Sequence, residues 1–145
     1  MNNEFLRHSV ATIVYRFQNV LQNSGVDFGD FSAGSGTRTP REIVRHMYEV
    51  SHATQVYIEE ERFEGYTATV CEFSQEVERF LETLTALDDV LVHRNIAENG
   101  ARRILQGPIA DMLAHVGQLA MLSRLSGFPI AGEDFSAASI EPGMR

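Results

Sequence analysis

Residues 70–87, VCEFSQEVERFLETLTAL, decide the fold class of this chain. Apolar residues recur there at alternating spacings of three and four, namely Val70, Phe73, Val77, Phe80, Leu84 and Leu87. This spacing puts them on one face of an α-helix that we expect to begin after Gly65, with glutamates and an arginine on the other faces. A helix with one apolar face needs partner helices, so the segment predicts a helical bundle.

A second helical segment precedes it, from about Asn3 to Asn23. Its apolar residues alternate spacings of four and three and are Leu6, Val10, Ile13, Phe17 and Val20. They form one buried stripe. The next stretch, 25–37, collects glycine, serine and aspartate without periodicity and predicts a loop.

The helix after this loop has the most explicit start in the sequence. Thr39 is placed as the N-cap, Pro40 takes the first helical position, and Glu42 completes a capping box. The helix should end near Glu61. Its expected inward stripe is Ile43, Val50 and Tyr57, with Met47 and Ala53 beside it.

The last helix is expected after a connection over 88–100 and a single turn of helix around 102–105. Gly107 and Pro108 predict its start, because a proline is tolerated in the first turn, where its missing N–H is not needed. Gly127 predicts its end. No segment has the alternating pattern of a strand, so the chain is expected to be all-α with four helices.

This last helix is apolar on more than one side. One side carries Leu119 and Leu122, and the other carries Ile109, Leu113, Val116 and Ala120. A helix that is apolar all round must be covered all round. We therefore expect a homodimer through its second apolar face, with the C-terminal segment as the competing cover.

The length of 145 residues fits one domain, which we assign to residues 1–145, with an extended tail over 130–145. The single cysteine, Cys71, excludes an internal disulfide, and no signal peptide is evident, so a cytoplasmic location is expected. No apolar run reaches the roughly 20 residues needed to cross a bilayer.

The charge balance bears on partners. Twenty acidic residues against twelve basic ones give a net charge of -8, which repels nucleic acid and anionic lipid. Every basic residue is arginine, which excludes Schiff-base chemistry by a lysine. We expect neither nucleic acid nor membrane as a partner.

One constellation of polar residues can carry chemistry. Asp111, His115 and Gln118 share one face of the last helix, and His46 lies among the inward positions of the second. A carboxylate inside a core needs a partner, and a divalent cation shared by His46, Asp111 and His115 supplies one. This donor set suits zinc, nickel or iron with open positions.

Plainer interpretations stay open for the same residues. Asp111 and His115 can form an intrahelical hydrogen bond, or Asp111 can favour the positive end of the helix dipole in a first turn. Glu49 is expected to be a surface charge, and Gln118 either orients His115 or is a satisfied core amide. The remaining histidines, His8, His52 and His93, are expected to be solvated.

Two segments resemble a known family. GPIAD at 107–111 followed by HVGQL at 115–119 looks like the fourth-helix signature of DinB/YfiT-like proteins, and TPREI at 39–43 leading to His46 resembles their second helix. The resemblance implies an up-down-down-up four-helix bundle, often dimeric. It also implies a nickel or zinc ion held by one histidine of the second helix and two of the fourth.

His46 and His115 match two of those positions, and Asp111 stands where a histidine is more usual. The resemblance implies a transferase or isomerase that depends on a metal and on a small thiol, with the metal stabilising a thiolate. The substitution leaves an alternative open, a metal-free dimeric scaffold or small-ligand-binding protein without catalysis.

Overall fold

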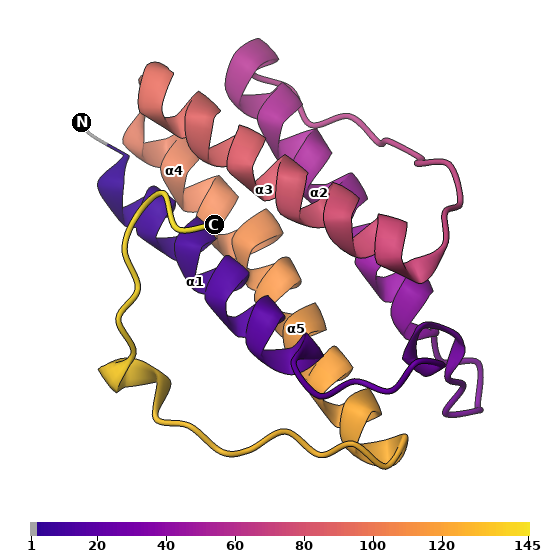
Figure 1. Cartoon of the computed structure of the whole chain (residues 1–145). Helices are drawn as coiled ribbons and strands as arrows, with labels where there is room; N and C mark the ends of the chain where they lie inside the picture. Colours follow the sequence, from indigo (N-terminus) through magenta and orange to yellow (C-terminus); the bar gives the residue numbers. More distant parts are fainter. Residues whose placement is uncertain (1–2) are drawn as a thin grey trace.

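The computed structural model describes residues 3–145, and all the regular secondary structure in this part of the chain is helical (Figure 1). Its helices are α1 (Glu4–Leu21), α2 (Pro40–Glu60), α3 (Phe73–His93), α4 (Glu98–Ile104) and α5 (Ala110–Leu125), with a π-helical turn η2 (Leu105–Ile109) and two 3-10 turns, η1 (Phe28–Asp30) and η3 (Phe135–Ala137). The part described contains no strand, which confirms the all-α prediction. The first two residues of the predicted domain 1–145 lie outside it.

The core is a single apolar cluster to which every long helix contributes. All five residues predicted for the inward stripe of α1 are buried. Phe17 of α1 meets Phe80 of α3 edge to face, with ring centroids 4.8 Å apart. The periodicity of the sequence therefore located this part of the core correctly.

Helix α2 begins as predicted, with a complete capping box. The backbone N–H of Glu42 donates to the Thr39 hydroxyl, and the backbone N–H of Thr39 donates to the Glu42 carboxylate at 3.0 Å. The buried face is rotated from the expected one, because Ser51 and Thr54 are fully buried while Val50 is half-buried. Thr54 satisfies its hydroxyl within the helix by donating to the Val50 carbonyl at 2.8 Å, which allows it to be buried.

We expect Thr39→Ala to lower the free energy of unfolding by about 1 kcal/mol, because one N–H of the first turn loses its acceptor. Urea denaturation followed by circular dichroism measures this. Thr67→Ala is the matched control, since Thr67 is exposed in a non-helical segment. An equal loss in both variants would contradict the assigned role of the cap.

Helix α3 begins at Phe73 and not after Gly65, so that prediction is wrong. Residues 61–72 form a non-helical linker that returns beside α2 and α3 (Figure 1). Val70, expected inside, is 68% exposed. The linker is held by carboxylates, because Glu49 accepts from the Ala68 N–H at 2.8 Å and Glu76 from the Cys71 N–H at 2.9 Å.

The far end of α3 also differs from the prediction. The helix continues through Asp88, where a connection was expected, as far as His93. Asp88 is buried and accepts two hydrogen bonds from the Arg7 guanidinium of α1, at 2.8 and 2.9 Å. The polar residues that suggested a loop here are therefore part of a helix, and one of them forms an ion pair with α1.

The fourth rod of the bundle is α4, η2 and α5 joined without a break, so Gly107 and Pro108 do not open a helix. Pro108 lies inside the π-helical turn. The Ala110 N–H donates to the Leu105 carbonyl, five residues back. Because Pro108 has no N–H to continue the ordinary ladder, this wider turn carries the helix past it.

Both sides of α5 that looked apolar in the sequence pack against other helices of the same chain, with Leu113 and Ala120 half-buried. Ile109 and Val116, assigned to a second outer face, are 1% and 3% exposed. The open face is a different one and carries mostly small residues, namely Ala110, Ala114, Gly117 and Met121. Contacts with both α1 and α2 explain why the sequence of α5 is apolar on two sides.

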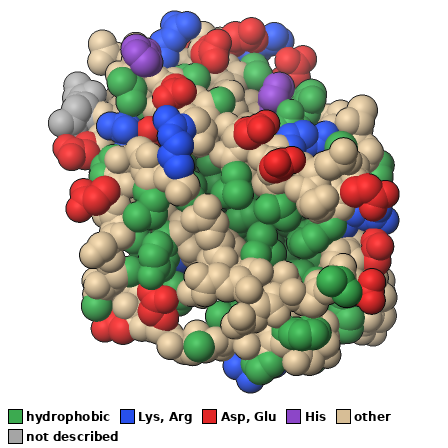
Figure 2. Space-filling model, in the orientation of Figure 1, with side chains coloured by type: hydrophobic (Ala, Val, Ile, Leu, Met, Phe, Trp, Pro, Cys, Tyr) green, Lys and Arg blue, Asp and Glu red, His purple; other side chains and the backbone are tan. Residues whose placement is uncertain are grey.

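Residues 126–145 pack partly along α1. Glu133 accepts a hydrogen bond from the Tyr15 phenol, which raises the pKa of Tyr15. The Arg16 guanidinium lies over the Phe135 ring at 4.0 Å. Figure 2 shows hydrophobic side chains gathered in the middle of one face of the molecule, with charged ones toward its edges. Over residues 3–145, no helix is long and apolar enough to cross a bilayer.

Candidate metal centre

The structure brings together the three side chains predicted to bind a metal. His46 Nε2 lies 3.2 Å from Asp111 Oδ2, and His115 Nε2 lies 3.4 Å from the same oxygen. One donor atom from each of the three lies within 4.8 Å of the others. Two ligands of one tetrahedral zinc ion, with bonds of about 2.0–2.1 Å, stand roughly 3.4 Å apart. The distances from His46 Nε2 and from His115 Nε2 to Asp111 Oδ2 therefore fit one shared ion.

Two secondary-structure features bring these residues together. The capping box of α2 sets the start of the helix that carries His46. The π-helical turn sets the rotation of α5, whose Asp111 and His115 are four residues apart and lie on one face. The imidazole rings of His46 and His115 meet edge to face, with centroids 4.8 Å apart.

The His115 ring is oriented by Gln118. The Gln118 amide oxygen lies 2.8 Å from His115 Nδ1, so Nδ1 donates and Nε2 keeps its lone pair. That lone pair faces a carboxylate oxygen of Asp111 at 3.4 Å. Two acceptors repel at this distance unless a cation or a proton lies between them. An imidazole held at its far nitrogen in this way is typical of metal ligands.

The expected burial of Asp111 is wrong, because its side chain is 43% exposed, against 11% for His115. Water solvates the carboxylate, so it does not need a cation to compensate for burial. The interpretation that places Asp111 at a helix dipole also fails, because the helical rod has already run from Glu98. The donor geometry alone supports the site.

Two neighbouring polar residues differ from expectation. Glu49 is not a free surface charge: its side chain is 21% exposed and holds the linker, and its nearer oxygen is 4.0 Å from His46 Nδ1, too far for a hydrogen bond. His52 is half-buried and not freely solvated, because its ring stacks on Tyr66 at 3.9 Å. His8 and His93 are exposed, as expected.

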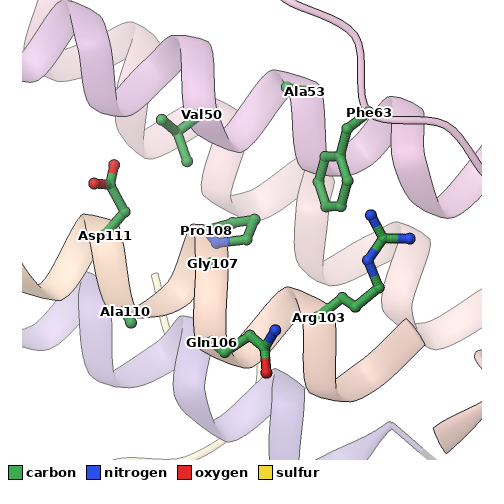
Figure 3. Close-up of a pocket in the computed structure, with 9 residues that line it drawn as sticks. All are labelled: Val50, Ala53, Phe63, Arg103, Gln106, Gly107, Pro108, Ala110 and Asp111. Atoms are coloured by element: carbon green, nitrogen blue, oxygen red, sulfur yellow. The ribbon is translucent and has the colours of Figure 1, made fainter. Parts of the chain in front are cut away.

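Asp111 also lies at one end of an open cleft of about 830 Å³ between α2, the linker and the fourth helical rod (Figure 3). The walls are largely apolar and include Val50, Ala53, Phe63 and Pro108. Arg103 and Gln106 lie toward the other end. A smaller cleft of about 330 Å³ reaches His115 and Gln118 from the opposite side.

Sequence analysis did not identify Arg103 and Gln106. The last helix was predicted to begin at Gly107, which separated these residues from Asp111. Read as one helix, the sequence places Arg103 within about 80° of Asp111 in helical angle, which is the signal that could have found it. Arg41, one of the arginines near the loop, instead pairs with Asp30 at 2.9 Å.

Comparison with known proteins gives no relative for this chain. No family model matches it, and neither a curated protein nor a solved structure matches it. The resemblance of 39–46 and 107–119 to DinB/YfiT-like proteins therefore rests on the residues alone.

Proposed function

We propose that the protein is a DinB-like up-down-down-up bundle that binds one divalent metal ion through His46, Asp111 and His115. The observation that supports this most directly is the convergence of His46 Nε2 and His115 Nε2 on Asp111 Oδ2, with Gln118 leaving the lone pair of His115 Nε2 free to face that oxygen. The parallel course of α2 and α3, joined by the returning linker 61–72, agrees with such a bundle (Figure 1).

The proposed activity is a metal- and small-thiol-dependent transfer or isomerisation. Zinc, nickel or iron suits two imidazoles and one carboxylate, and such an ion would lower the pKa of a bound thiol or water. The residues present have separate tasks: His46 and His115 donate nitrogen, Asp111 donates oxygen, and Gln118 fixes the His115 ring. The cleft beside Asp111 gives a small substrate a route to the site.

Metal analysis of protein purified without an affinity tag tests this proposal. We expect close to one equivalent of zinc, nickel or iron, either as purified or after addition of the metal and removal of the excess. Less than about a tenth of an equivalent, not recovered on adding any of the three, would reject a metal-dependent function. The measurement does not require knowledge of the substrate.

A metal-free scaffold that binds a small apolar ligand is the second candidate. The exposure of Asp111 favours it, because a carboxylate in water is stable when hydrogen-bonded only to His46. A homodimer and a cytoplasmic location are part of both proposals, but because the second apolar face predicted for the dimer contact is packed inside the chain, the contact is moved to the open small-residue face of α5. Analytical ultracentrifugation at micromolar concentration tests the dimer, and a monomer would exclude it.

A further inference from the structure

The cleft carries opposite charges at its two ends, Asp111 at one and Arg103 at the other (Figure 3). We propose that it binds a small, elongated monocarboxylate, with the carboxylate on Arg103, an apolar stem along the walls and the other end at Asp111. This names a ligand class for the cleft. Only one part of this proposal rests on the proposed function, namely that the end of the ligand beside Asp111 contacts a metal.

Arg103 has a guanidinium available for a ligand. Its neighbour Arg102 pairs with Glu98 at 2.7 Å, whereas Arg103 has no ion-pair partner among residues 3–145. The Arg103 guanidinium instead lies 5.5 Å from the ring centroids of Tyr57 and Phe63, which stack on each other at 4.0 Å. The guanidinium therefore lies beside this aromatic pair, at the outer limit of a cation–π contact, and its hydrogen-bonding edge stays available for a carboxylate.

The middle of the cleft is shaped for an apolar stem. Val50 and Ala53 of α2 face Pro108 of η2 across it, and Phe63 of the linker closes one side. Gly107 leaves room in its wall, because a Cβ added there would meet nothing within 4 Å. The cleft is open to solvent, and its volume of about 830 Å³ leaves room for a small ligand that lies along the surface.

Charge selects a monocarboxylate over a phosphate or a dicarboxylate. Arg103 is the only basic residue lining the cleft, and the chain carries a net charge of -8. A doubly charged ligand would face repulsion that one guanidinium does not offset. Asp111 repels a carboxylate at its own end, so the ligand has one favoured direction. Gln106 adds an amide beside the guanidinium.

The length of the ligand follows from the helix. Arg103 and Asp111 are eight residues apart on one rod, or about 12 Å at roughly 1.5 Å per residue. A medium-chain monocarboxylate spans this distance. When a metal occupies the site of the proposed function, a thiol at the far end of such a ligand reaches its open position.

Titration calorimetry with octanoate and with octan-1-ol, on protein treated with EDTA, tests the cleft independently of the metal. We expect Arg103→Gln to weaken octanoate binding about tenfold or more through the loss of a charge-assisted contact, and to leave octan-1-ol unchanged. Gly107→Leu, which fills the cleft, should weaken both. Ala110→Leu serves the same purpose if Gly107→Leu fails to fold.

Arg102→Gln is the matched control, and octanoate binding should keep its wild-type affinity in it. The proposal is overturned if wild-type protein does not bind octanoate at millimolar concentrations, or if Arg103→Gln and Arg102→Gln have equal effects. With metal added, 8-mercaptooctanoate should bind more tightly than octanoate, and His115→Ala should remove only that gain. If octanoate binds but 8-mercaptooctanoate binds no more tightly in the presence of metal, the metal-dependent function is rejected. The assignment of the cleft as a monocarboxylate site is then retained.

Discussion

Replacing His115 by alanine is expected to lower the affinity for zinc or nickel more than about a hundredfold, because loss of a ligand exceeds the roughly 10–100-fold cost of losing an outer partner. The side chain is 11% exposed and belongs to a packed helix, so His115→Gln accompanies it as a variant of similar size. Isothermal titration with each metal, on protein freed of metal beforehand, measures the change.

His52→Ala is the matched control on α2, because His52 stacks on Tyr66 and does not belong to the cluster. Gln118→Leu should give a smaller loss, about 10–100-fold, since it removes only the acceptor that orients His115. Equal metal affinity in His115→Ala and His52→Ala would exclude His115 as a ligand. No loss in Gln118→Leu would exclude the orienting role of the amide.

Arg79→Met is expected to lower the free energy of unfolding by about 3 kcal/mol or more. The Glu76 carboxylate is fully buried, and Arg79 donates to it at 2.7 Å. Glu76 also accepts from the Cys71 N–H, so it joins the linker to α3. Removing the cation leaves a buried carboxylate that only a backbone amide compensates. Urea denaturation of the variant measures the loss.

A double variant separates this charge effect from lost packing. Glu76→Gln combined with Arg79→Met should be more stable than Arg79→Met alone, because a neutral amide does not need the guanidinium. Arg102→Met, which breaks an exposed ion pair, is the control and should leave the denaturation midpoint unchanged. A double variant less stable than Arg79→Met would contradict the argument.

Patterns that depend on a single helix were predictable from the sequence. The buried stripe of α1 follows from periodicity alone, and the start of α2 follows from Thr39, Pro40 and Glu42. The meeting of His46 with Asp111 and His115 was also predicted, since each lies on an inward or flanking face. Local rules are sufficient for the buried stripe and the helix start because their physical cause is local, whereas the meeting of the three side chains also required the expectation that both helices turn these faces toward one bundle interior.

The errors arose where tertiary contacts override local signals. Pro108 normally starts or stops a helix, but here the fourth rod passes through it by a π-helical turn. Val70 fits the heptad of α3 yet belongs to a linker held by carboxylates of α2 and α3. Asp111 points toward His46 as predicted, but it lies at the edge of a cleft and is partly exposed. Periodicity predicts the direction of a side chain around the helix and does not predict how deeply it is buried.

The π-helical turn also separates two kinds of residue along one rod. Arg103 lies before it, and Asp111 and His115 lie after it. Under the roles proposed above, a substitution at Arg103 is expected to change the affinity for the ligand and to leave the donor atoms of His115 in place, because the two residues lie on opposite sides of this turn. Ligand affinity and metal affinity are then separable by substitution along a single rod.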